Sequence, residues 1–200
     1  MAIFDLKNGP HEAYIDIQIG AYWELERNGT DEGLEFDEVN HIFSVNGQTL
    51  PSVTQVLRAN HMTPEFYAHI DPWYLERGRL VHLATEYDDK GTLDEDTIDD
   101  VVRPRLDAYR VFKMDFREKI TGIEKRLWHP TLKFAGIIDR TITGNTCYSL
   151  HLKPGQRVPY KLVEIEQIRS HLNVFISALN VMRWREANLK GEQNVLSRVE

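Results

Sequence analysis

The stretch expected to decide the fold is Ala2-Ile3-Phe4-Asp5-Leu6-Lys7, which places two charged residues in an apolar run. Its apolar residues, followed by Asn8-Gly9-Pro10, predict a short buried strand that ends at a turn. Residues i and i+2 of a strand face the same way, so Asp5 and Lys7 would project together. Burying a carboxylate and an ammonium costs free energy unless they meet partners or a metal ion. A strand at the edge of a sheet, with its ends in water, is the plainer interpretation.

The composition indicates one globular domain with enough chain to bury a core. The chain has 200 residues, and its 42% hydrophobic and 28% charged content is ordinary for that class. A net charge of −7 argues against a protein that coats nucleic acid non-specifically, but allows a nuclease with a local basic track. The acidic run between Asp88 and Asp100 predicts a solvated loop. We expect a cytoplasmic protein, because Cys147 is the single cysteine and no membrane span or signal peptide is visible.

Hydrophobic periodicity and turn residues predict one α+β domain over residues 1–200, with a mixed central β-sheet flanked by helices. Asn46-Gly47 predicts a hairpin turn, Ser52 opens a capping box, and Asp71-Pro72 starts a helix. Residues 28–35 predict a flexible linker. The other predictions are helices over 14–25, 52–57, 71–87, 103–119 and 168–182, and strands over 41–45, 48–50, 122–128, 134–142, 148–152 and 160–165.

Three groups of polar residues fall in predicted strands and helices where burial is expected. They are Asp5 with Lys7, Asp139 in an apolar strand, and His82 with Glu86 one helical turn apart. Two carboxylates and an imidazole would form a site for Mg²⁺ or Mn²⁺, which can activate a water molecule and neutralise charge on a phosphate. A lysine beside such a site can position or deprotonate that water, or stabilise the transition state.

Each of these residues also has an ordinary structural interpretation. His82 and Glu86 have the spacing of a pair on a helix surface, and Asp139-Arg140 would suit an ion pair at the end of a strand. Glu124 would suit an exposed position in a strand. Each of these structural interpretations remains possible for its own residue. Taken separately, they do not predict that all of these polar groups occur in one chain.

Four motifs, spread over most of the chain, resemble those of the PD-(D/E)XK nuclease superfamily, and within it the phage exonucleases related to the RecB and lambda types. Arg77-Gly78-Arg79-Leu80-Val81-His82 resembles the Gly-x-x-x-His helix, and Phe134-Ala135-Gly136-Ile137-Ile138-Asp139-Arg140 resembles the strand whose aspartate binds metal. Ile3-Phe4-Asp5-Leu6-Lys7 resembles the strand with the second acid and the lysine. Gln18-Ile19-Gly20-Ala21-Tyr22 resembles the Gln-x-x-x-Tyr helix that follows it.

The resemblance implies a restriction-endonuclease-like core that binds Mg²⁺ or Mn²⁺. His82, Asp139, Asp5 and the carbonyl of Leu6 would hold the ion. Lys7 would be the catalytic lysine and would act together with the two aspartates.

The resemblance also implies DNA as the substrate. Gln18, Tyr22 and Arg79 would contact the DNA, and Glu86 and Glu124 would be accessory residues. The expected activity is that of a phage recombination or repair exonuclease that hydrolyses phosphodiester bonds in the bacterial host cytoplasm. The protein would form a homo-oligomer or bind a recombination protein. The alternative is a catalytically silent nuclease-fold protein that binds DNA or inhibits a partner.

The order of the motifs departs from that of the family. In the family, the Asp-x-Lys strand and the Gln-x-x-x-Tyr helix follow the aspartate strand, near the place that Thr146-Cys147 marks here. In this chain residues 1–27 carry both motifs ahead of everything else, so they form a transposed strand–helix unit, with 28–35 as its linker. We expect residues 2–7 to pair with the strand around 135–141, because a single register then sets Asp5 and Lys7 beside Asp139.

Overall fold

The computed structural model describes residues 2–4, 12–63, 71–144 and 146–189. The elements, in chain order, are β1 (Ala2–Phe4), α1 (Glu12–Asn28), β2 (Leu34–Asp37), β3 (Ile42–Val45), β4 (Gln48–Leu50), α2 (Val53–Ala59), α3 (Pro72–Lys90), η2 (Glu95–Thr97), α4 (Arg103–Asp115), β5 (Ile120–Trp128), β6 (Ala135–Ile142), β7 (Tyr148–Leu152), β8 (Tyr160–Glu164) and α5 (Ile168–Asn188). Every described helix is too short or too polar to traverse a lipid bilayer.

The predicted α+β class is confirmed, and the described strands are distributed over three small sheets rather than one. β1 lies parallel to β7, which pairs antiparallel with β8. β2, β3 and β4 form an antiparallel meander, and β5 and β6 form a two-stranded ribbon. Among the described strands, parallel and antiparallel pairing are therefore mixed in the sheet of β1, β7 and β8.

The partner of the first strand differs from the expected one. In the described part of this strand, Ala2 lies opposite Ser149 and Phe4 opposite His151, so β1 pairs with β7 rather than with β6. β7 is largely buried and has an edge free of β8, which suits an apolar strand. β1 also contacts β6.

The predictions made from local turn and capping residues are confirmed for several elements. Asn46 and Gly47 both have positive φ, 51° and 76°, as a tight hairpin between β3 and β4 requires. The capping box of α2 is formed: Ser52 Oγ accepts from the Gln55 N–H, and Gln55 Oε1 accepts from the Ser52 N–H. Asp71 caps α3, and its side chain accepts a hydrogen bond from the backbone of the first turn.

The prediction of a flexible linker over residues 28–35 is wrong, because part of this segment is paired with β5 and part belongs to β2. The Thr30 N–H donates to the Trp128 carbonyl and the Trp128 N–H donates to the Thr30 carbonyl, both at 2.9 Å, which fastens this segment to β5. β2 then begins at Leu34. Its four residues alternate between half-buried and exposed, a pattern too short to stand out in the sequence.

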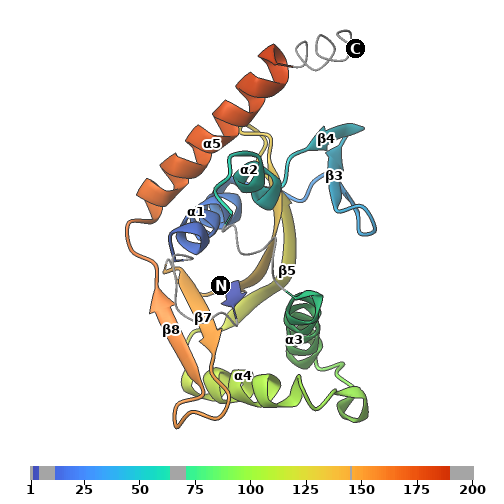
Figure 1. Cartoon of the computed structure of the whole chain (residues 1–200), viewed down its shortest axis with the longest axis vertical. Coiled ribbons are helices and arrows are strands. Elements are labelled where there is room, and N and C mark those ends of the chain that lie inside the picture. Colours follow the sequence, from blue (N-terminus) through green and yellow to red (C-terminus); the bar gives the residue numbers. More distant parts are fainter. Residues whose placement is uncertain (1, 5–11, 64–70, 145, 190–200) are drawn as a thin grey trace.

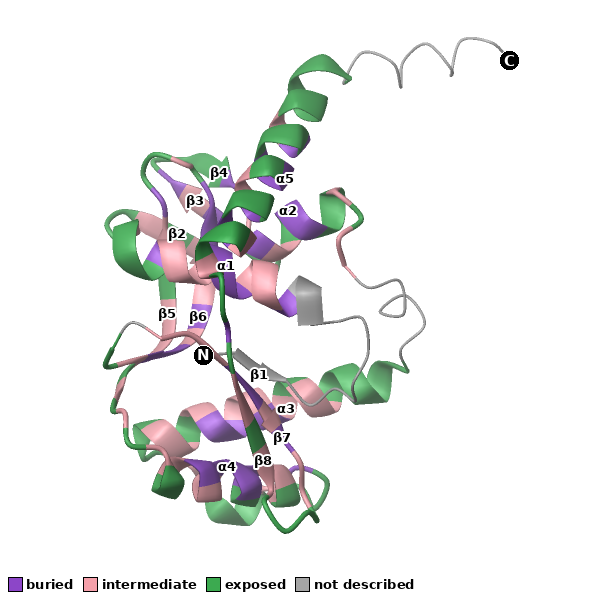
Figure 2. Cartoon of the chain, turned by 90° about the vertical axis from the view of Figure 1, so that its left-hand side faces the viewer, coloured by how far each residue is buried: buried purple, intermediate pink, exposed green. Residues whose placement is uncertain are grey.

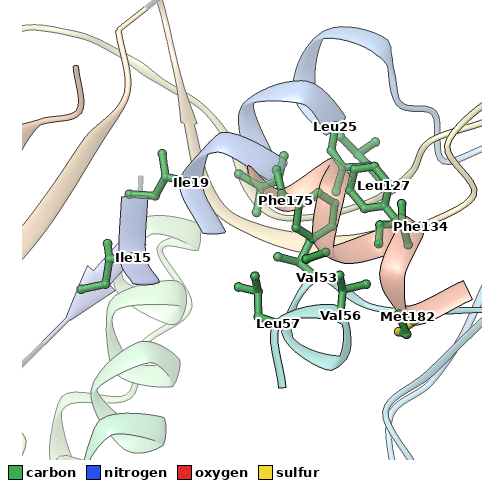
Figure 3. Close-up of a cluster of buried hydrophobic side chains, with 14 of the residues drawn as sticks. Ile15, Ile19, Leu25, Val53, Val56, Leu57, Leu127, Phe134, Phe175 and Met182 are labelled. Carbon is green, nitrogen blue, oxygen red and sulfur yellow. The ribbon is translucent and has the colours of Figure 1, made fainter. Parts of the chain in front are cut away.

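The described residues form three apolar clusters, and the elements of the two larger ones, here called the first and second core, lie at opposite ends of the molecule with β5 running between them (Figure 1). The first core joins α1, α2 and α5 to β5 and β6 (Figure 3). The second joins α3 and α4 to β7 and β8, and Figure 2 shows buried positions along these elements. The fully buried members of the first core are Ala21, Leu25, Val53, Val56, Leu57, Phe134, Phe175 and Leu179. The junction of α3 with β5 and β6 therefore lies between the cores.

α1 and α5 pack closely because Gly20 has no side chain. A Cβ at Gly20 would lie 2.7 Å from the backbone nitrogen of Leu172, closer than real side chains approach. We expect Gly20→Ala to lower the free energy of unfolding by about 2 kcal/mol, since two helix backbones must move apart. Urea unfolding followed by circular dichroism measures this change.

Gly78→Ala in α3 is the matched control, because a Cβ there would meet nothing within 4 Å. It should raise stability by about 0.5–1 kcal/mol through the better helix propensity of alanine. A Gly20→Ala protein as stable as the Gly78→Ala protein would contradict the close packing of α1 on α5.

Candidate metal centre

Three side chains from three elements converge between the two cores. His82 of α3, Glu124 of β5 and Asp139 of β6 each place one ligand atom within 4.8 Å of the others. His82 Nδ1 lies 3.9 Å from Asp139 Oδ1. The side chains of His82, Glu124 and Asp139 are 37%, 26% and 22% exposed, so solvent reaches all three. One imidazole nitrogen with two carboxylates is a donor set that fits Mn²⁺ or Mg²⁺, and we call this cluster the metal centre.

The pairing of β5 with β6 brings the two carboxylates together. The register changes by one residue between Ile120 and Gly122, and from Gly122 to Trp128 it is constant. Ile123 lies opposite Arg140 and Lys125 opposite Ile138, so Glu124 and Asp139 occupy the positions between these two pairs. Like charges that are neighbours across a strand pair repel. This register therefore places two acidic side chains close together.

Glu124 carries a further cost in its backbone. Its φ is 48°, in the left-handed region that a non-glycine residue rarely adopts, which costs on the order of 1 kcal/mol. Burial, with the charge of Asp139 as a second cause, raises the pKa of Glu124 to about 7, although Arg140 opposes the rise. Near neutral pH the carboxyl is therefore partly protonated, and a cation would displace that proton.

The metal centre contains two residues predicted as ligands and one predicted as accessory. His82 and Asp139 meet as the motifs implied. Glu124, predicted as accessory, lies in the cluster, and its alternative interpretation as an exposed strand residue is wrong. Glu86 forms an ion pair with Lys90 and lies outside the cluster.

The helix motif of α1 lies over the strand that carries Asp139. Gln18 Nε2 donates to Tyr22 Oη at 3.1 Å. The Tyr22 ring packs over Gly136, where a Cβ would lie 2.8 Å from the ring. A cavity of about 110 Å³ between α1 and β6 is lined by both Tyr22 and Asp139. Tyr22 therefore shares a cavity with Asp139, while His82 and Glu124 do not line it, and Gln18 lies one turn away along α1.

Arg79 lies on α3, one turn before His82, and is exposed. Its Nη2 pairs with Glu76 Oε1 at 2.6 Å. A DNA phosphate at this position would therefore compete with Glu76 for the guanidinium, and exposed pairs of this kind are weak.

Asp5, Leu6 and Lys7 lie outside the described residues. Their roles as metal ligands and catalytic lysine remain predictions. β1, which directly precedes them, contacts β6, the strand that carries Asp139.

The sequence interpretation missed the buried charges beside the metal centre. Asp88 and Asp89 were assigned to a solvated loop, which is wrong: both belong to α3, and the Asp89 side chain is 3% exposed. Asp89 Oδ2 accepts from Arg140 Nε at 2.6 Å and from Tyr109 Oη at 2.5 Å. The spacing held a signal, because residues seven apart in a helix share a face and Asp89 follows His82 by seven.

Comparison with known proteins finds no relative: no protein-family model, no curated protein and no solved structure matches this chain. The interpretation of the metal centre therefore depends on the positions and chemistry of His82, Glu124 and Asp139.

We expect Glu124→Gln to raise the free energy of unfolding at pH 8 in EDTA by about 2 kcal/mol, allowing for partial exposure, and to change it little at pH 4.5. The carboxyl has a pKa of about 7 in the folded protein against 4.5 as its ordinary value, so the folded state binds more protons between these pH values. Its contribution to stability is full below pH 4.5 and is lost as the pH rises through 7. Glutamine cannot ionise and avoids this loss.

Glu164→Gln, at an exposed position in β8, is the matched control and should leave stability nearly constant at both pH values. Urea unfolding of the three proteins at both pH values provides the comparison. A gain in stability from Glu124→Gln that does not depend on pH would show that ionisation of the Glu124 carboxyl is not its cause.

Proposed function

We propose that the protein is a metal-dependent DNA nuclease, an exonuclease that hydrolyses phosphodiester bonds with Mg²⁺ or Mn²⁺. The observation that carries the proposal is the convergence of His82, Glu124 and Asp139 from three elements. Two of these residues belong to motifs that resemble the metal ligands of PD-(D/E)XK nucleases. Glu124 also has a left-handed backbone and a carboxyl with a raised pKa, a combination found more often at functional sites than at ordinary strand positions.

The donor set also suggests which ion binds best. Bound there, a divalent ion would activate a water molecule and neutralise charge on the scissile phosphate. Imidazole nitrogen suits Mn²⁺ better than Mg²⁺, whose preference is for oxygen. We therefore expect Mn²⁺ to bind more tightly than Mg²⁺. Binding would become stronger as the pH rises through 7, because Glu124 loses its proton there.

The remaining roles follow from the resemblance. Asp5 would complete the ligand set with the carbonyl of Leu6, and Lys7 would position or deprotonate the attacking water. Gln18 and Tyr22, together with Arg79, would hold the DNA beside the metal centre. This arrangement suits a phage recombination or repair enzyme acting on DNA in a bacterial cytoplasm, alone, as a homo-oligomer, or with a recombination protein.

Asp139→Asn should reduce cleavage of end-labelled linear DNA at least 100-fold in either metal, because it removes an anionic ligand. It should also weaken Mn²⁺ binding in calorimetry while leaving the circular dichroism spectrum unchanged. His82→Ala should weaken Mn²⁺ binding with a smaller loss of cleavage. Asp107→Asn, at an exposed position in α4, is the matched control and should keep full activity.

Undiminished cleavage by Asp139→Asn would refute the assignment of the metal centre. Circular DNA in a parallel reaction separates exonuclease from endonuclease activity, and EDTA should abolish both. Mn²⁺ binding by the unaltered protein without any loss of linear DNA would favour the catalytically silent alternative, which binds DNA or inhibits a partner.

Lys7→Ala should retain metal and DNA binding but lose most turnover, because a group that acts on the transition state affects rate more than ground-state affinity. Single-turnover cleavage and DNA binding in Ca²⁺ separate the two quantities. Equal losses in both would make Lys7 a simple phosphate contact.

A further inference from the structure

We propose that Arg140 is a positioning residue for the metal centre, whose guanidinium fixes the relative positions of the three elements that carry the ligands. The inference rests on the proposed function, because it concerns how the centre is held ready for a divalent ion. Arg140 would touch neither the ion nor the DNA, and would act through Glu124 and the backbone at Asp139.

The Arg140 guanidinium contacts every ligand-bearing element. Nε donates to Asp89 Oδ2 at 2.6 Å, and Nη2 lies 3.4 Å from Thr85 Oγ1, which attaches the group to α3. Nη1 donates to the Asp139 carbonyl at 2.6 Å in β6 and to Glu124 Oε1 at 3.3 Å in β5. A planar fork with fixed donor directions can set these distances together, whereas a single point charge cannot.

Burying the charge of Arg140 costs free energy. The Arg140 side chain is 0% exposed, so its charge has lost its hydration. Apolar residues of similar volume often replace buried ion pairs without loss of stability. Stability alone therefore does not explain why a guanidinium is buried here. A positive charge that holds Glu124 and Asp139 close to each other, although both are acidic, does explain it.

The far end of Arg140 is anchored more firmly than the end at the metal centre. Asp89 also accepts from Tyr109 Oη at 2.5 Å and from Lys113 Nζ at 2.9 Å, so three donors fix its carboxylate. The contact with Glu124 is longer, at 3.3 Å. Glu124 can therefore leave Arg140 for a cation while the guanidinium stays in place.

Arg140→Lys tests the inference because it keeps the charge and removes the fork. Calorimetry should show that Arg140→Lys binds Mn²⁺ with 10- to 100-fold lower affinity, the usual effect of losing a group that orients a metal ligand. Thermal unfolding in EDTA measures the stability of the same variant without metal. Arg110→Lys is the matched control: Arg110 pairs with Asp88 in the same network but with none of the three ligands. It should lower the melting temperature and leave the Mn²⁺ affinity within twofold.

The readouts distinguish the two proposals. A purely structural role would make both variants less stable while each folded molecule binds Mn²⁺ as before, and that result would overturn the inference and leave the metal centre intact. If the unaltered protein binds no Mn²⁺, the proposed function itself fails and the inference with it. If Arg140→Lys does not fold, Asp89→Asn decides by the same affinity criterion, because it releases the anchored end of Arg140.

Discussion

The buried ion pair between Arg140 and Asp89 joins β6 to α3, the elements that carry Asp139 and His82. α3 packs into the second core through Val81 and Ala84, and that contact alone does not fix it against β5 and β6. The ion pair supplies this missing link, and Tyr109 extends it into the second core. Because the pair lies in a medium of low polarity, breaking it would leave a charge without hydration, which strongly favours the observed docking.

Several energetic costs meet at Glu124. It has a left-handed backbone, the carboxylate of Asp139 nearby, and a pKa well above its ordinary value. Other residues also have positive φ, among them His41, His61, Lys133 and Gln167, but Glu124 combines this backbone with a half-buried acid beside a second acid. A strained backbone that coincides with a shifted carboxyl pKa is typical of a functional site.

The features that could be predicted from the sequence are those whose causes lie within a few residues of one another along the chain. The cap at Ser52 and the turn at Asn46 act within a few residues, so they were predicted correctly. Asp139 was predicted because a carboxylate within an apolar strand is itself unusual. Glu124 was predicted only as an accessory residue, because its place beside Asp139 depends on the pairing register of β5 with β6, which no local pattern encodes. The partner of Asp89 lies 51 residues further along the chain, beyond the reach of periodicity.

The pairing of β1 with β7 has a consequence for how the protein is made. The two strands are about 150 residues apart in the chain. At a synthesis rate on the order of 10 residues per second, β1 leaves the ribosome about 15 seconds before its partner. During that interval an apolar strand edge has nothing to pair with, and it is a target for chaperones and for other nascent chains. β1 is thus synthesised long before the strand with which it pairs.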